Sequence, residues 1–126
     1  MISEPLIAVV DDDFGMRMSL DGLVRSLGYR TAIFSAAEGL LASDHAATAA
    51  CIISDIEMPG GIDGIELASK LLELWPNRPV ILISAFVNDK VRAAAEEVGA
   101  FIILKKPFVG ETLIDAIECA LSRQSA

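Results

Sequence analysis

The 126-residue sequence has few of the residues that mark secreted, membrane or metal-thiolate proteins. Its two cysteines, Cys51 and Cys119, lack CxxC spacing and only one histidine accompanies them, so we expect buried, unpaired thiols. No apolar run reaches the roughly 18 residues that span a membrane. The opening stretch, MISEPLIAVVDDD, lacks the basic segment of a signal peptide. These absences predict a soluble cytoplasmic protein without a membrane partner.

Basic residues are also scarce, since ten Lys and Arg stand against 18 Asp and Glu and give a net charge of −8. A nucleic-acid-binding surface needs an excess of positive charge, so we expect no direct nucleic acid binding. Apolar residues, in contrast, make up 53% of the chain, which excludes a disordered protein. The length suits one domain, which we assign to residues 1–126.

Short apolar segments alternate with helical patterns along the chain. The predicted strands are residues 6–10, 30–34, 51–54, 80–84 and 101–104. All but the second are continuous apolar runs, as expected for strands covered on both faces, while the more polar second one suits a sheet edge. The predicted helices are 16–27, a short one from 35, 65–75, 88–99 and 110–123, and the small residues 43–50 predict a loop. A strand followed by a helix, five times over, predicts an α/β fold with a doubly wound parallel sheet.

Three of these helices carry local end signals. Gly28 is expected to end the first helix, because glycine commonly follows a helix in the left-handed conformation. Ser35-x-x-Glu38 has the form of a capping box that opens the second helix. Asn88 or Asp89 is expected to cap the fourth.

The functional crevice of an open parallel sheet lies beyond the carboxyl ends of its strands. The polar residues at those ends are Asp11, Asp12, Asp13, Asp55, Ser84, Lys105 and Lys106. Two carboxylates about 4 Å apart repel by about 4 kcal/mol at an effective dielectric near 20, so their clustering favours a bound divalent cation. Carboxylates without His or Cys favour Mg²⁺. With a hydroxyl and an ammonium group nearby, the site suits phosphoryl transfer with Asp55 as the nucleophile.

Four segments carry a family resemblance. IAVVDDDFGMR, IISDIEMPG, VILISA and KKPF resemble the four signatures of bacterial response-regulator receiver domains, in that family's order and spacing. The resemblance covers about residues 5–121. It implies a flavodoxin-like (βα)5 fold with a five-stranded parallel sheet in the order 2-1-3-4-5. It also implies a phosphorelay component of a two-component system, which catalyses only its own phosphorylation and dephosphorylation.

The resemblance implies a role for each residue of the acidic site. Asp55 corresponds to the aspartate that accepts a phosphoryl group from a phosphohistidine. Asp12 corresponds to the direct Mg²⁺ ligand and Asp11 to a neighbour that helps through water, while Asp55 and the backbone carbonyl of Glu57 complete the protein ligands. Asp13 falls at a variable position, so we expect it to cap the following helix, where an aspartate is favourable.

The resemblance also implies a switch. Ser84 would move toward the phosphoryl group and Lys106 would pair with it, which would repack the loop after residue 84 and change the affinity for a partner. The Lys106–Pro107 bond is commonly cis in the family, and Lys105 is expected to face solvent. Ile103 stands where the family often has Tyr or Phe, and Phe101 lies two residues earlier on the same predicted face. We therefore expect coupling through the loop backbone and the packing of helix 88–99.

Two further side chains correspond to positions that set the lifetime of the phosphorylated state. Phe86 would shield the phosphoryl group, and Glu57 would hinder or orient the attacking water. Between these residues, the turn MPGGIDG is one residue longer than the family's usual turn. It predicts a more mobile loop, or one shaped for a particular kinase.

The implied partners are a sensor histidine kinase or phosphotransfer protein, a downstream protein or output domain, and a second copy in a phosphorylation-dependent homodimer. The short tail SRQSA favours a stand-alone receiver, and the alternative is the isolated receiver of a DNA-binding transcriptional regulator. Two rival interpretations stay open. A phosphatase of the haloacid-dehalogenase type would need an Asp-x-Asp pair followed by Thr or Val, where this chain has Asp11-Asp12-Asp13-Phe14. A degenerate receiver would not accept phosphate at all.

Overall fold

The computed structural model describes residues 4–125, and the side chains of residues 4–122. The first three residues and the end of the tail, on which the signal-peptide and stand-alone predictions partly depend, lie outside the described part.

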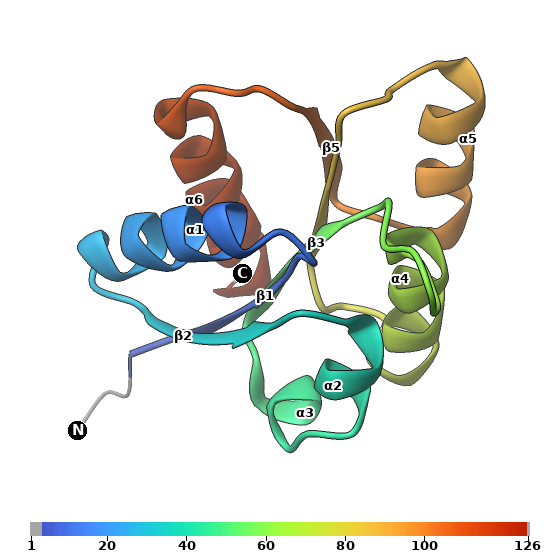
Figure 1. Ribbon diagram of the computed structural model, residues 1–126. Coiled ribbons are helices and arrows are strands. Elements are labelled where there is room, and N and C mark those ends of the chain that lie inside the picture. Colours follow the sequence, from blue (N-terminus) through green and yellow to red (C-terminus); the bar gives the residue numbers. More distant parts are fainter. Residues whose placement is uncertain (1–3, 126) are drawn as a thin grey trace.

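Five parallel strands form one sheet at the centre of the molecule (Figure 1). They are β1 (Leu6–Val10), β2 (Arg30–Phe34), β3 (Cys51–Asp55), β4 (Val80–Ser84) and β5 (Ile102–Lys105). Their order is β2-β1-β3-β4-β5, which confirms the predicted doubly wound, flavodoxin-like sheet. Every residue of β1, β3 and β4 is buried, and β2 is an edge strand as expected. The prediction of full burial is wrong for the fifth strand, because β5 forms the other edge and is partly exposed.

Helices cover both faces of this sheet. They are α1 (Phe14–Ser26), α2 (Ala37–Leu41), α3 (His45–Thr48), α4 (Gly64–Leu74), α5 (Asp89–Val98) and α6 (Gly110–Ser125). Successive strand side chains point to opposite faces, so each strand contributes to two cores. Ile52 and Leu82 pack with α4 on one face, whereas Ile53 and Ile83 pack with α1 and α6 on the other. Figure 1 shows α1 beside α6, with α4 and α5 across the sheet.

Two predicted helix ends are confirmed. The Asn88 side chain caps α5 by accepting a hydrogen bond from the backbone N–H of Val91 at 2.8 Å. Gly28 follows the end of α1 with φ of +91°, a conformation that favours glycine because it has no Cβ.

The predicted capping box is wrong. Ala36, not Ser35, occupies the N-cap of α2, and no side-chain hydrogen bond to the start of that helix is found in the described part of the chain. Glu38 instead accepts a hydrogen bond from the backbone N–H of Ile62 at 3.0 Å, in the loop between β3 and α4. A tertiary contact has therefore taken the place of the local one.

The loop predicted for residues 43–50 contains the short helix α3. Arg78, far away in sequence, donates hydrogen bonds to the carbonyls of Ala46 and Ala47, both at 3.0 Å. This turn is therefore held by a distant side chain, and His45 is its first residue.

The cysteines behave differently from each other. Both are free thiols, but only Cys51 is buried, whereas Cys119 is exposed. Burial raises the pKa of Cys51 to about 12. The prediction of burial is wrong for Cys119. This residue does not lie on the face of α6 that buries Ile117 and Ala120.

Candidate functional site

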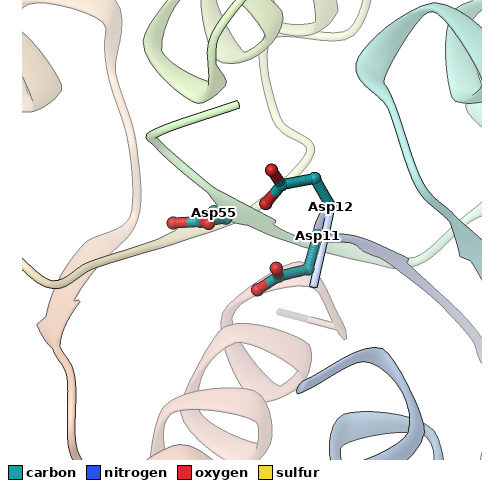
Figure 2. Close-up of side chains that lie close together, drawn as sticks. All are labelled: Asp11, Asp12 and Asp55. Carbon is teal, nitrogen blue, oxygen red and sulfur yellow. The ribbon is translucent and has the colours of Figure 1, made fainter. Parts of the chain in front are cut away.

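Three carboxylates converge at the carboxyl ends of two neighbouring strands. Asp11 and Asp12 directly follow β1, and Asp55 is the last residue of β3. The parallel register pairs Val10 with Ser54, which brings the next residues of both strands level with each other. One carboxylate oxygen from each of the three acids lies within 4.8 Å of the others. Figure 2 shows these side chains close together, with Asp55 across from Asp11 and Asp12.

Burial differs within this cluster. Asp11 and Asp55 are buried, at 0% and 4% exposure, while Asp12 is exposed. The cluster is thus open to solvent on the side of Asp12 and closed beneath.

Lys106 lies against the buried pair of acids. It follows β5, and its Nζ is 3.3 Å from Asp11 Oδ2 and 3.3 Å from Asp55 Oδ2. The Lys106–Pro107 peptide bond is cis. Lys105, the residue before it, is exposed as expected. One ammonium group thus neutralises part of the charge of two carboxylates.

The pKa values record this imbalance of charge. Burial, followed by the charge of Asp11 and then by that of Glu57, raises the pKa of Asp55 to about 6, against the opposing charge and hydrogen bond of Lys106. Burial alone would lower the pKa of Lys106, but the carboxylates of Asp11 and Asp55 outweigh it and leave that pKa raised. Lys106 therefore stays charged, and the site holds more negative than positive charge.

One carboxylate oxygen of Asp55 has no hydrogen-bond partner among the described residues. Its Oδ1 is buried and accepts no hydrogen bond from any described residue. A buried oxygen without a partner is unfavourable unless a ligand satisfies it. The side chains that could bind a cation here are the carboxylates of Asp11, Asp12 and Asp55, and hard divalent cations such as Mg²⁺ prefer oxygen ligands. The residues at this site therefore fit a hard divalent cation.

Ser84 is the last residue of β4, and its hydroxyl group both donates and accepts hydrogen bonds. Ser84 is buried, and its Oγ lies 2.7 Å and 2.9 Å from the two carboxylate oxygens of Glu57. The same Oγ accepts a hydrogen bond from the backbone N–H of Phe86 at 3.0 Å. Glu57 thus reaches from the loop after β3 to the end of β4.

The remaining predicted switch residues, Phe86 and Ile103, make no hydrogen bond or ion pair with the acidic cluster in the described part of the chain. Phe86 is 72% exposed, so its ring covers no buried group at present. Ile103 packs with the core that contains Leu82, its neighbour on β4. Phe101 packs with the opposite core, beside Leu104. The prediction that Phe101 and Ile103 share a face is therefore wrong, because Phe101 precedes β5 and does not follow its alternation.

The loop after β3 is fixed against the site by glycine. A Cβ on Gly64 would lie 2.3 Å from the carbonyl oxygen of Asp55, so α4 can begin there only with glycine. Gly60 has φ of +88°, and Gly61 lies against the Glu38 carboxylate, which also accepts the Ile62 N–H. The extra residue of this turn is thus held in place by α2.

The sequence did not predict that two further residues, Arg17 and Glu38, support the site. Arg17 donates a hydrogen bond from its guanidinium to the backbone carbonyl of Asp11 at 2.8 Å, and Glu38 holds the loop after β3. The spacing of Arg17, one turn after the capping Asp13, was the available signal, since residues four apart share a helix face. Asp13 itself caps α1 as expected, accepting the Met16 N–H at 2.7 Å.

The fold and the acidic crevice define a flavodoxin-like α/β domain with its polar site at the switch point of the sheet. Residues 7–118 match the response regulator receiver domain family. The chain belongs to that family, which confirms the resemblance, and it is a receiver domain of two-component signalling. No helix in the described part of the chain is long and apolar enough to cross a membrane.

Curated relatives are response regulators. The chain is 33% identical over 116 residues to the transcriptional regulatory protein TdiR of Thauera aromatica, covering 92% of this chain and 51% of TdiR. It is 32% identical over 121 residues to the transcriptional regulatory protein FixJ of Bradyrhizobium diazoefficiens, covering 96% of this chain and 58% of FixJ. The chain therefore spans about half the length of these relatives.

Solved receiver structures are similar throughout. A CheY-like receiver domain from Methanospirillum hungatei superposes with a TM-score of 0.89 at 25% identity, covering 98% of both chains. The BeF3-activated receiver domain of DrrB superposes with a TM-score of 0.87 at 26% identity, covering 94% of this chain and 98% of that one. Both share the architecture on which the site is built.

Proposed function

We propose that this receiver accepts a phosphoryl group on Asp55, from a phosphohistidine of a sensor histidine kinase or phosphotransfer protein, in a reaction that requires Mg²⁺. The observation that carries the proposal is the buried Asp55 Oδ1, which has no partner among the described residues although Lys106 and two further carboxylates surround it. A buried carboxylate oxygen without a protein partner is free to bind a phosphoryl group or a metal ion.

The chemistry follows from these groups. A carboxylate oxygen of Asp55 forms a bond to phosphorus while the bond from phosphorus to the donor imidazole nitrogen breaks, and that nitrogen keeps the electron pair. Lys106 offsets charge on the phosphoryl oxygens, and the Ser84 hydroxyl donates a hydrogen bond to one of them. Bound Mg²⁺ would supply the remaining positive charge on the phosphoryl oxygens.

The metal would be held by this chain's own oxygens. Asp12 would be the exposed ligand, Asp55 would contribute a carboxylate oxygen, Asp11 would assist through water, and the backbone carbonyl of Glu57 would complete the set. Arg17 supports this arrangement by fixing the Asp11 carbonyl. Lys106 forms ion pairs with Asp11 and Asp55, and among the described residues it forms none with Asp12. The exposed side of the cluster, at Asp12, is therefore available to a metal ion.

The proposed output is a change in partner binding. The phosphoryl group changes the charge at Asp55 from −1 to about −1.5 to −2, and this charge draws Ser84 inward and repacks the loop between β4 and α5. The response passes through the backbone of that loop and the packing of Ile103 beneath α5. The downstream partner is a protein, an output domain or a second copy of the receiver, and the receiver itself remains in the cytoplasm and makes no contact with nucleic acid.

A second candidate concerns that output. TdiR and FixJ are transcriptional regulatory proteins about twice as long as this chain, so control of a DNA-binding output domain is the alternative output. Binding of an operator-containing DNA by a longer form of the protein, and not by residues 1–126, would favour this candidate.

The test uses acetyl phosphate as donor. Intact-mass spectrometry should show one added phosphoryl group on the wild-type chain with Mg²⁺, none with EDTA, and none on Asp55→Asn. Asp13→Asn is the matched control, because Asp13 lies in the same acidic run but caps α1. Equal modification of Asp55→Asn and wild type would refute the proposal. Steady release of inorganic phosphate from a simple phosphomonoester would instead support a phosphatase.

A further inference from the structure

The Ser84 hydroxyl has one proton and more than one acceptor around it. Its Oγ lies 2.7 Å and 2.9 Å from the carboxylate oxygens of Glu57, and 3.0 Å from the backbone carbonyl of Phe86. A charged acceptor makes the stronger and shorter hydrogen bond, so the proton goes to Glu57. The Phe86 N–H fills a remaining acceptor position of the hydroxyl oxygen. The hydrogen-bonding capacity of Ser84 is thus used within the protein.

That proton is needed elsewhere in the proposed reaction. Phosphoryl stabilisation requires Ser84 to donate toward Asp55, yet Asp55 Oδ1 receives no hydrogen bond from any described residue. We propose that Glu57 is a positioning residue: its side-chain carboxylate holds the Ser84 hydroxyl in the unphosphorylated state and releases it when Asp55 is phosphorylated. We call this hydrogen bond the Glu57 latch. The inference rests on the proposed function and adds a role for this side chain in regulating it.

Charge supplies a reason for the release. Glu57 lies two residues from Asp55, and its charge is one of those that raise the Asp55 pKa, so the two groups already repel. A phosphoryl group increases the negative charge on the Asp55 side to about −2. The same anion therefore attracts the Ser84 proton and repels the carboxylate that holds it. Both effects act in one direction, toward the phosphorylated arrangement.

The position of Glu57 permits this movement. Glu57 is exposed, so its carboxylate regains water when it leaves Ser84. Ser84 is buried at 0% exposure and has no such alternative, so its hydroxyl must pass from one acceptor to another. The latch therefore weakens the response to a phosphoryl group without preventing it.

Beryllofluoride, a phosphoryl mimic, gives the test when its affinity is measured in Mg²⁺ by titration calorimetry. The four proteins are wild type, Glu57→Ala, Ser84→Ala and the double variant. Glu57→Ala removes both the latch and the repulsion, so beryllofluoride should bind about tenfold more tightly, as expected for the loss of one charge-assisted hydrogen bond. In the Ser84→Ala background only the repulsion remains to be removed, so the same substitution should strengthen binding by much less. Equal fold-changes in both backgrounds would overturn the latch.

Glu57→Gln separates charge from hydrogen bonding. Glutamine keeps an acceptor oxygen at the same reach but has no charge, so its affinity should lie between those of wild type and Glu57→Ala. An affinity of Glu57→Gln equal to that of Glu57→Ala, in both Ser84 backgrounds, would assign the whole effect to repulsion and contradict the latch.

A second measurement needs no phosphoryl mimic. In the unmodified protein, the three-bond couplings of the Ser84 β protons should indicate one rotamer, and Glu57→Ala should average them. Unchanged couplings would overturn the latch even where the protein takes up phosphate normally. A wild-type protein that binds no beryllofluoride and takes no phosphoryl group would instead refute the proposed function, and the couplings would still decide on the latch.

Discussion

Asp55 ionises in the folded protein at a cost that replacement by asparagine should remove. Its pKa is raised from 3.8 to about 6, first by burial and then by the charge of Asp11. At about 1.4 kcal/mol for each pH unit, keeping Asp55 ionised destabilises the metal-free fold by about 3 kcal/mol. Asp55→Asn has nearly the same shape and no charge, so it should raise the free energy of unfolding by about 2 to 3 kcal/mol at pH 7.5.

The sign of the pH dependence follows from linkage. A raised pKa means that the folded state binds the proton more tightly than the unfolded state. The destabilisation of the wild type is therefore complete above pH 6 and is relieved as the pH falls from about 6 toward 4. The gain from Asp55→Asn should shrink over that window and nearly vanish at pH 4.

Urea unfolding in EDTA, followed by circular dichroism, measures both free energies. Asp12→Asn is the matched control, because it removes the same charge from the same cluster but at an exposed position. It should give less than half of the gain. A wild type as stable as Asp55→Asn at pH 7.5, or a gain that stays constant down to pH 4, would refute the assignment of a destabilising buried charge. Added Mg²⁺ should then stabilise the wild type more than Asp55→Asn, since ligand binding to the folded state raises its stability.

Three further predictions concern glycine, lysine and the metal. Gly64→Ala should destabilise the fold by about 2 kcal/mol or more in thermal unfolding, because its Cβ would meet the Asp55 carbonyl oxygen at 2.3 Å. Gly22→Ala, in the exposed middle of α1 with no neighbour within 4 Å, should instead stabilise by up to about 1 kcal/mol. Lys106→Met should slow modification by acetyl phosphate about 100-fold, whereas Lys105→Met, at an exposed position, should leave the rate near wild type. The apparent Mg²⁺ affinity in calorimetric titrations should fall by about tenfold for each pH unit below about 6, because protonation of Asp55 competes with the metal.

Each of these has a clear contrary result. A Gly64→Ala protein that melts with the wild type would mean that α4 can move away from the acceptor strand. Equal rates for the two lysine variants would remove Lys106 from the reaction. A Mg²⁺ affinity that is constant between pH 7 and 5 would show that Asp55 is not a ligand.

The sheet was predictable from sequence because its signals are local and repeated. Continuous apolar runs marked the buried strands, and helical spacing marked the crossovers, so only a few topologies remained. The convergence of Asp11 and Asp55 followed from the same pattern, since parallel strands end at one edge. The location of these two acids at one edge of the sheet could therefore be predicted without knowing any side-chain contact.

Side-chain partners were not predictable in the same way. Glu38 fits a capping box by spacing, yet it bonds Ile62, 24 residues away. Glu57 and Ser84 are 27 residues apart and meet only because two loops lie over the same strand ends. Sequence spacing indicates which residues share an element, and it does not indicate which loops will cross.

The exceptions at the edges have a similar physical cause. Phe101 lies just before β5, where the alternation of a strand has not begun, so its face could not be read from parity. The short helix α3 has no apolar period of its own and depends on hydrogen bonds from Arg78. In both cases tertiary contacts decide a conformation that local sequence leaves open.

The most direct test of the account locates the phosphoryl group itself. After reaction with acetyl phosphate and Mg²⁺, borohydride reduces an aspartyl phosphate to homoserine, and peptide mapping then identifies the residue. Homoserine is expected at position 55 alone. Homoserine at position 11, 12 or 13 with Asp55 unmodified would contradict it.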